Sequence, residues 1–184
     1  MTATDLRVRP PDSSRSPRPG TYRLDTQRCV VDVTARQPWL TAVRGRLTAG
    51  SGRLVVQQDL LDSWVRVDLV AGSLSTGLGP RDAALKGPDV LDAESHPWIR
   101  FESTLVSPHD DGRFLAEADL YVRDHVVPVV AQIRPVDVTP DRIRVAVTAT
   151  LSWRALGLGW GSTIERMGML GDRISVVVAA EFRS

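Results

Sequence analysis

Three histidines and one cysteine are the side chains in this sequence best suited to metal binding or nucleophilic catalysis. His96, His109 and His125 are scattered, and no two have the HxH or HxxxH spacing that brings imidazoles onto one metal ion. Cys29 stands alone, so it has no partner for an internal disulfide, and no base lies near it in the sequence. A free cysteine in an apolar run usually packs as a small hydrophobe, so we predict no metal site and no catalytic residue.

A cluster of acidic residues is the second candidate for chemistry. Asp82, Asp89, Asp92 and Glu94 lie within one short segment, and paired carboxylates are suited to acid–base catalysis. No nucleophile with an adjacent base accompanies them, so solvated helix and loop positions are the commoner explanation. We interpret Asp82 and its neighbour Arg81 as a local cap or ion pair that fixes this segment. No phosphate-binding loop or dinucleotide fingerprint occurs, and we expect no cofactor.

Tryptophan is the third feature, with five residues: Trp39, Trp64, Trp98, Trp153 and Trp160. Two interpretations stay open. The one we favour is packing at strand ends or barrel rims. The other is an aromatic mouth around an apolar ligand, since an indole ring can be half wet.

The elements that must position these residues show a hydrophobic period of two from Thr21 onward. Apolar and polar residues alternate, as in antiparallel strands with one wet and one buried face. About eight such strands, separated by turn signals, predict a closed barrel or a sandwich. Pro128 predicts an edge or a bulge at its position. The expected buried face includes Ile99, Phe101, Ser103 and Leu105 on one strand and Phe114, Ala116, Ala118, Leu120 and Val122 on the next.

One segment interrupts the β pattern between two strands. Residues 75–95 predict a short helix, with Pro80 in its first turn and Gly87-Pro88 at its end. Residues 88–93 are expected to form a second helical turn. This helical insertion lies where a barrel would need a lid or plug.

The first 20 residues differ in composition from the rest. Four prolines among Ser and Arg predict a disordered tail over residues 1–20, followed by one domain over residues 21–184. The tail lacks the apolar stretch of a signal peptide, and no segment approaches the length of a membrane span. We therefore expect a cytoplasmic protein without stable membrane insertion. The net charge of +1 gives no reason to expect nucleic acid as a partner.

The segment 73–104 resembles the YceI-like family of lipid-binding, lipocalin-like proteins. The shared motif combines Thr-Gly, Arg-Asp-x-x-Leu, an aspartate-bearing turn, a proline and an aromatic strand residue. Its members here are Thr76, Gly77, Arg81, Asp82, Leu85, Asp92, Pro97 and Phe101. The opening segment 21–47 and the Pro128-Val129 pair are also similar to the family. The chain departs from the family pattern at Gln27-Arg28-Cys29, where His-Ser is usual, and at Asp124 to Val127.

This resemblance implies an all-β fold, an extended eight-stranded antiparallel lipocalin-like barrel with the short helical insertion, around a tunnel. It also implies binding, storage or transport of a polyisoprenoid, an isoprenoid quinone or a similar lipid, without catalysis. We expect this apolar lipid as the partner, bound by a monomer or a homodimer.

The inward faces mix large and small side chains, and the small ones leave room for a ligand, although a packed core would show the same alternation. We expect the inward residues that bind the ligand to be Val33, Val65, Val67, Leu69, Ile99, Phe101, Phe114, Leu120, Val145, Val147, Ile174 and Val176. One alternative is an enzyme that acts on a small apolar substrate in the same barrel, which would need convergent polar groups inside. Another is a protein-interaction module that uses the tryptophan-bearing surface or the tail.

Overall fold

A computed structural model describes residues 17–35, 42–157 and 173–184 of the chain. Strands dominate these residues, with one α-helix and three short 3-10 turns. The strands are β1 Gly20–Leu24, β2 Val30–Ala35, β3 Val43–Val56, β4 Trp64–Ser75, β5 Trp98–His109, β6 Arg113–Val122, β7 His125–Thr139, β8 Arg142–Ser152 and β9 Arg173–Arg183. The helix is α1 Gly79–Lys86, and the 3-10 turns are η2 Thr26–Arg28, η3 Leu60–Asp62 and η4 Asp110–Gly112.

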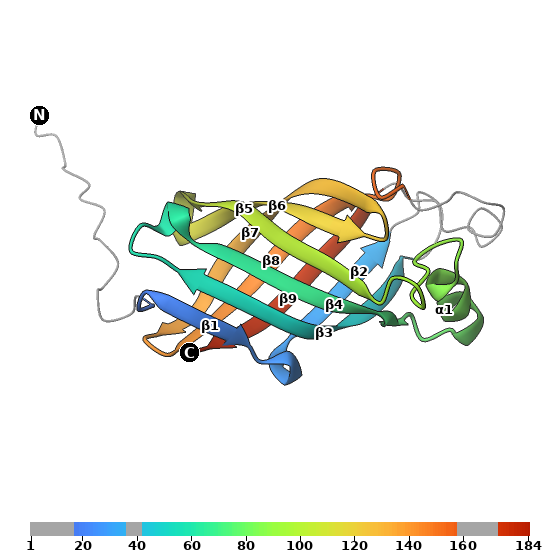
Figure 1. The fold of residues 1–184 in the computed structure, drawn as a ribbon, viewed down its shortest axis with the longest axis horizontal. Helices are drawn as coiled ribbons and strands as arrows, with labels where there is room; N and C mark the ends of the chain where they lie inside the picture. Colours follow the sequence, from blue (N-terminus) through green and yellow to red (C-terminus); the bar gives the residue numbers. More distant parts are fainter. Residues whose placement is uncertain (1–16, 36–41, 158–172) are drawn as a thin grey trace, which may run out of the picture.

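Eight of the described strands close into an antiparallel barrel (Figure 1). Strands β2, β9, β8, β7, β6, β5 and β4 pair in that order, and β3 pairs with both β2 and β4, which completes the ring. The strand β1 also lies between β3 and β9, ahead of β2 along the same line, so β1 and β2 act as one strand interrupted by η2. The prediction of an eight-stranded antiparallel barrel is confirmed, and closure excludes the sandwich.

The barrel has two ends with different connections. At one end lie the β3–β4 connection with η3, the β5–β6 connection with η4, and the β7–β8 turn; we call this the mouth end. At the other end lie the insertion with α1, between β4 and β5, and the tight β6–β7 turn; we call this the α1 end (Figure 1). Residues 1–16 of the expected tail, and Trp39 and Trp160, lie outside the described residues.

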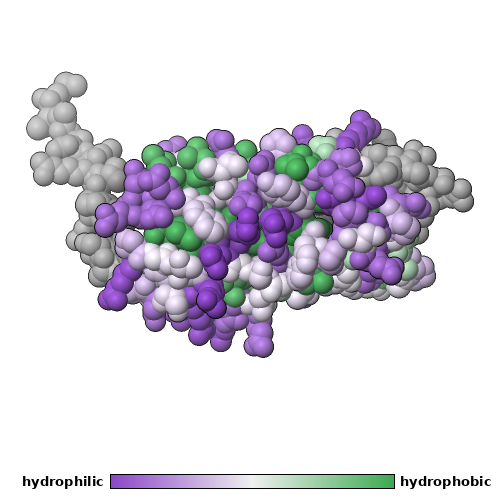
Figure 2. Space-filling view, in the orientation of Figure 1, coloured by the Kyte–Doolittle hydropathy of each residue, from purple (hydrophilic) through white to green (hydrophobic). Residues whose placement is uncertain are grey.

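Alternation along the strands places apolar side chains inside and polar ones outside. Hydrophilic side chains cover much of the outer wall, with smaller hydrophobic patches between them (Figure 2). Tyr22 and Val31 are the most deeply buried large side chains of the interrupted strand, each 1% exposed. The hydroxyl of Tyr22 lies 2.8 Å from the carbonyl oxygens of both Arg18 and Pro140, so it links the start of β1 to the β7–β8 turn.

The strand β5 departs from strict alternation. Its pairing with β6 shifts register between Ser103 and Leu105, because one extra residue is accommodated there as a bulge. A one-residue shift moves the following side chains to the opposite face. The prediction for Leu105 is therefore wrong: it is 37% exposed, and Val106 lines the interior instead. Ser103 stays buried, and its hydroxyl oxygen accepts a hydrogen bond from the Val65 N–H at 2.8 Å.

Proline in β7 marks a strand edge, as predicted. Pro128 pairs with Asp119 of β6, whereas the described pairing of β7 with β8 begins only at Ala131. The first part of β7 is thus paired on one side among the described residues, and a residue without an N–H is tolerated there. The register shift of β7 lies further along, between Pro135 and Asp137.

The insertion contains one helix, not two. Helix α1 has Pro80 in its first turn and Gly87 at its C-cap, as the sequence predicts. Residues 88–93 form turns instead of the expected second helical turn. The chain folds back there because the free carbonyls at the end of α1 accept its N–H groups: Leu91 donates to the Leu85 carbonyl at 3.1 Å and Ala93 to that of Lys86 at 3.0 Å.

Candidate ligand cavity

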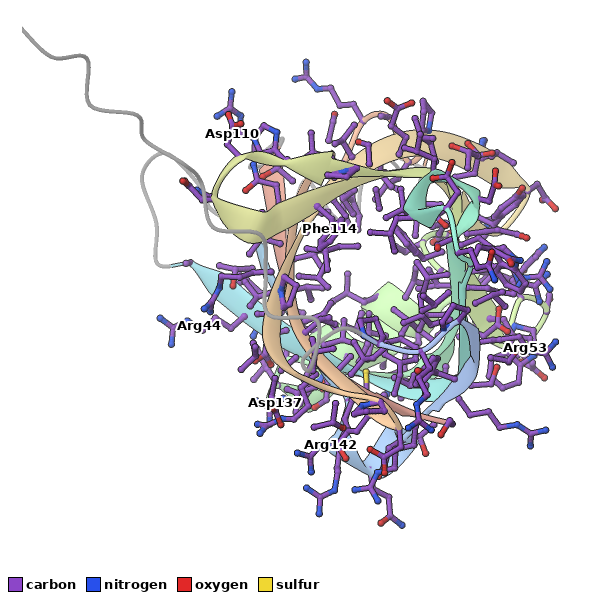
Figure 3. The ribbon with its side chains drawn as sticks, turned by 90° about the vertical axis from the view of Figure 1, so that its left-hand side faces the viewer. Arg44, Arg53, Asp110, Phe114, Asp137 and Arg142 are labelled. Atoms are coloured by element: carbon purple, nitrogen blue, oxygen red, sulfur yellow. The ribbon has the colours of Figure 1, made fainter. Side chains whose placement is uncertain are left out.

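The barrel interior is hollow along much of its length. It contains a cavity of about 840 Å³ whose wall includes residues from every strand between β2 and β9. Figure 3 looks into the barrel from the mouth end, where Phe114 points into the interior, while Arg53, Asp110 and Arg142 point away from it. The volume is within the range of pockets that hold drug-sized or larger ligands, roughly 300–1,000 Å³.

The alternation of apolar and polar residues along the strands predicted the interior residues correctly. All twelve side chains that the sequence indicated as facing inward line this cavity: Val33, Val65, Val67, Leu69, Ile99, Phe101, Phe114, Leu120, Val145, Val147, Ile174 and Val176. Their contact with a ligand stays a prediction. Because they come from six different strands, closure of the barrel is what brings them onto one wall.

Several residues of the cavity wall could not be predicted from alternation, because they lie in the segments that connect the strands. Leu85 and Leu91 come from the insertion, and Trp153 and Leu156 follow the last residue of β8. Leu85 had a signal in the sequence, since it is the leucine of the Arg-Asp-x-x-Leu motif. Trp153 packs against the core and also lines the cavity, so both interpretations stay open for it. Trp98, in contrast, is 50% exposed on the outer face.

Cys29 belongs to the cavity wall and not to a reactive site. The side chain is 8% exposed, and burial raises the pKa of the thiol to about 11. At neutral pH the group is therefore a protonated thiol, which is a poor nucleophile. Its interpretation as a small buried hydrophobe is confirmed.

At the α1 end, apolar side chains of the insertion line the cavity. Leu85 and Leu91 are 5% and 7% exposed, and both contribute to the cavity wall. Asp82 holds the first turn of α1 to the end of β4: its carboxylate accepts the Thr76 N–H at 2.7 Å and also the Thr76 hydroxyl. These hydrogen bonds from Thr76 hold the pKa of Asp82 below its usual value. Arg81 donates to the Thr76 hydroxyl oxygen at 2.8 Å, so both predicted residues converge on Thr76 and fix the segment.

The β6–β7 turn fastens the rest of the insertion. Arg123 donates to the Val90 carbonyl at 3.1 Å. The His96 ring lies 3.3 Å from the carboxylates of both Asp92 and Asp124. These contacts tie residues 90–96 to the neighbouring turn, and no cluster of metal-binding side chains occurs within the described residues.

The mouth end has more polar and more exposed lining. Gln57, Gln58 and Leu60 line the cavity here and are all exposed. The N–H of Gln57 donates to the hydroxyl of the buried Ser63 at 3.0 Å, and the carboxylate of Asp59 accepts the Leu61 N–H at 3.0 Å. These bonds shape a short connection whose tip stays outside the barrel. The described part of the chain contains no helix long and apolar enough to cross a membrane.

Residues 22–182 match the YceI-like domain family. The chain belongs to this family. None of the curated proteins compared with the chain matches it.

Solved structures share the architecture of this YceI-like domain at low sequence identity. Burkholderia cenocepacia BcnA superposes with a TM-score of 0.73 at 13% identity, covering 86% of this chain and 98% of BcnA. A polyisoprenoid binding domain from Saccharophagus degradans gives 0.69 at 9% identity, covering 91% and 99%. The Campylobacter jejuni YCEI protein gives 0.66 at 15% identity, covering 81% and 89%. At these identities the likeness establishes the fold.

Proposed function

We propose that this YceI-like domain binds a long apolar lipid of the polyisoprenoid type in its cavity, and stores or carries it without changing it chemically. The observation that carries the proposal is a closed barrel with a large interior whose wall is almost entirely apolar. The polyisoprenoid binding domain from Saccharophagus degradans has the same fold, which supports this class of ligand.

The cavity volume suits a chain of several isoprene units. A methylene group occupies about the volume of a water molecule, roughly 30 Å³ in a liquid, so the cavity has room for about 28 carbon atoms. That corresponds to five or six units of five carbons. Burial contributes about 0.8 kcal/mol per methylene. The free energy gained by burying a chain of this length therefore exceeds the roughly 4–15 kcal/mol cost of association.

The distribution of polar groups orients the ligand. Gln57 and Gln58 lie at the mouth end, whereas the α1 end of the wall presents Leu85 and Leu91. Thr76 lines the α1 end too, but its hydroxyl is engaged by Asp82 and Arg81. We therefore place the apolar tail toward α1 and any polar end group at the mouth. The twelve inward residues form the contact surface for the tail.

A non-catalytic role is supported by the chemistry of the wall. The polar lining residues in the described part of the chain are Cys29, Gln57, Gln58, Ser63, Thr76 and Trp153. Catalysis on a bound substrate would need an acid, a base or an activated nucleophile directed at it. Cys29 is protonated. The Thr76 hydroxyl donates to the Asp82 carboxylate and accepts from Arg81, so these hydrogen bonds commit it to fixing α1.

The test is native mass spectrometry of protein isolated from its own host, with organic extraction of the same sample. The wild type is expected to carry one lipid per chain, and the spectrum also distinguishes a monomer from a homodimer. Absence of lipid from freshly isolated protein, or a covalently altered product in its place, contradicts the proposal.

Two substitutions measure where the lipid lies. Ala180 lines the cavity near the mouth, and Ala149 lines it beside Val176, four residues of β9, or about 13 Å, deeper. Ala180→Phe is expected to abolish lipid binding, while Ala149→Phe admits only shorter chains. The control is Thr148→Phe, which adds the same ring to the exposed face of β8 and leaves lipid binding unchanged. Equal lipid content in all three variants contradicts the assigned location.

A further inference from the structure

Five arginines lie side by side across neighbouring strands of the barrel wall. Arg66 of β4 pairs with Arg53 of β3, which pairs with Arg23 of β1. Arg23 also pairs with Arg183 of β9, which pairs with Arg142 of β8. We call this row the arginine collar. Its side chains face outward, since the residues next to them on these strands, such as Leu24, Val65 and Phe182, are buried.

A row of like charges on adjacent strands does not by itself stabilise the fold. Side chains directly opposite on adjacent strands have Cβ atoms about 4.5–5.5 Å apart, and like charges at that distance destabilise the sheet. Carboxylates compensate only part of the row. Arg66 forms an ion pair with Glu102 at 2.8 Å. Arg142 forms one with Asp137, and Arg183 forms one with Glu181, both at 2.6 Å. Arg23 and Arg53, in the middle of the row, are exposed and have no carboxylate partner among the described residues. The uncompensated charge therefore points to an anionic partner.

The collar lies next to the opening of the cavity. Arg142 begins β8, Arg183 ends β9, and Arg23, Arg53 and Arg66 lie within three residues of the mouth ends of their strands. In Figure 3, which looks into the mouth, Arg53 and Arg142 project outward from the rim. At about 3.3 Å per residue, the collar is no more than roughly 10 Å behind the mouth.

An apolar tip stands beside the collar. In η3, between β3 and β4, Leu60 and Leu61 are 39% and 50% exposed, and Leu60 also lines the cavity. Exposed leucines that extend beyond the strand ends at the mouth, with cations on the strands behind them, match the layering of a bilayer. Its acyl region lies below a layer of phosphates, and arginine stems can span the boundary.

We propose that the mouth end docks on an anionic lipid bilayer, with the arginine collar on the phosphates and the Leu60–Leu61 tip at the acyl boundary. An acidic protein would satisfy the collar but would not account for an apolar tip continuous with the cavity. Asp59 and Asp62 flank the tip, and Asp110 and Asp111 lie on η4 at the same end. These carboxylates tilt the docked barrel toward the collar side. Transfer of lipid at this surface rests on the proposed function, but docking itself does not.

The test is flotation of the full chain with vesicles of phosphatidylcholine, with and without phosphatidylglycerol. Wild type is expected to bind the anionic vesicles and to be released by salt. Each arginine near an anionic surface contributes roughly a fivefold change in partitioning, so Arg23→Gln with Arg53→Gln is expected to reduce binding about 30-fold. The matched control is Arg44→Gln with Arg134→Gln, which changes the net charge equally at exposed positions outside the collar.

A second pair of variants tests the tip. Leu61→Ser is expected to weaken vesicle binding, while Leu78→Ser, at a leucine 52% exposed at the α1 end, is not. The proposal is overturned if wild type fails to bind anionic vesicles, if the two double variants lose binding equally, or if soluble polyglutamate binds where vesicles do not. Lipid content of the collar variant, measured by native mass spectrometry, separates the two proposals: it stays at the wild-type level whether or not docking is lost.

Discussion

The two ends of the barrel are built from strand connections, but these connections place their leucines differently. At the α1 end, the connection between β4 and β5 is long enough to carry Leu85 and Leu91 back against the strands. At the mouth end, the connection between β3 and β4 leaves Leu60 and Leu61 exposed, although Leu60 also lines the cavity. Both ends therefore contain leucines, and what differs is the length of chain available to return them to the interior.

Polar groups follow the same division. At the α1 end they bind one another, as Asp82, Thr76 and Arg81 do, so buried leucines and local hydrogen bonds fix the insertion against the strands. At the mouth end Gln57 and Gln58 are exposed beside the opening. Under the proposed function, this difference places the apolar tail at the α1 end and its exchange at the mouth end.

Shortening one leucine at each end is expected to have the largest effect. Leu85→Ala should lower the free energy of unfolding by about 2–5 kcal/mol, because it removes the packing contacts of a buried side chain and enlarges the cavity beside it. Leu60→Ala should change it by less than about 1 kcal/mol, since Leu60 is 39% exposed. Urea denaturation of both variants measures the difference. Similar losses for the two would show that the mouth is as tightly packed as the α1 end.

Access to the interior is tested by the thiol of Cys29. The pKa of this thiol, about 11 instead of 9.0, makes the thiolate roughly a hundredfold scarcer than for an exposed cysteine at the same pH. Alkylation at pH 8 should therefore be at least a hundredfold slower than in a Cys29→Ser, Ser184→Cys variant, whose thiol is exposed. Added lipid should slow it further by filling the cavity. Rapid reaction that lipid does not affect would contradict a route through the mouth.

Acid sensitivity should differ modestly between the ends. Hydrogen bonds from Thr76 lower the pKa of Asp82 at the α1 end, and one from Thr139 lowers that of Asp141 at the mouth end. A folded-state pKa below the unfolded value of 3.8 stabilises the fold fully above pH 3.8, and this contribution is lost as the pH falls through the folded-state pKa.

Asp82→Asn should speed hydrogen exchange in α1 at pH 7, and Asp141→Asn should do so in the β7–β8 turn, with both effects shrinking below pH 3.8. The effect at α1 should be larger, because Asp82 accepts more hydrogen bonds than Asp141. A difference from wild type that persists unchanged in acid would rule out the carboxylate charge as its cause.

The amino-acid sequence by itself determined the strand content, the inward set of residues and the position of the helix. Alternation is a local property, so Val145 and Val147 could be predicted to face inward without knowledge of the residues opposite them. It failed at Leu105, because a bulge depends on the neighbouring strand. The prediction of a second helical turn over residues 88–93 failed too. Turns form there instead, and their N–H groups bind the free carbonyls at the end of α1.

Only the tertiary structure decided that the inward faces surround a space instead of filling it. Periodicity reports which face is apolar, but the width of the interior depends on how many strands close and with what stagger. The arginine collar has the same origin: Arg23 and Arg53 are 30 residues apart in sequence and become direct neighbours only through pairing. Properties set by register and closure are relations between distant segments, and a one-dimensional pattern does not contain them.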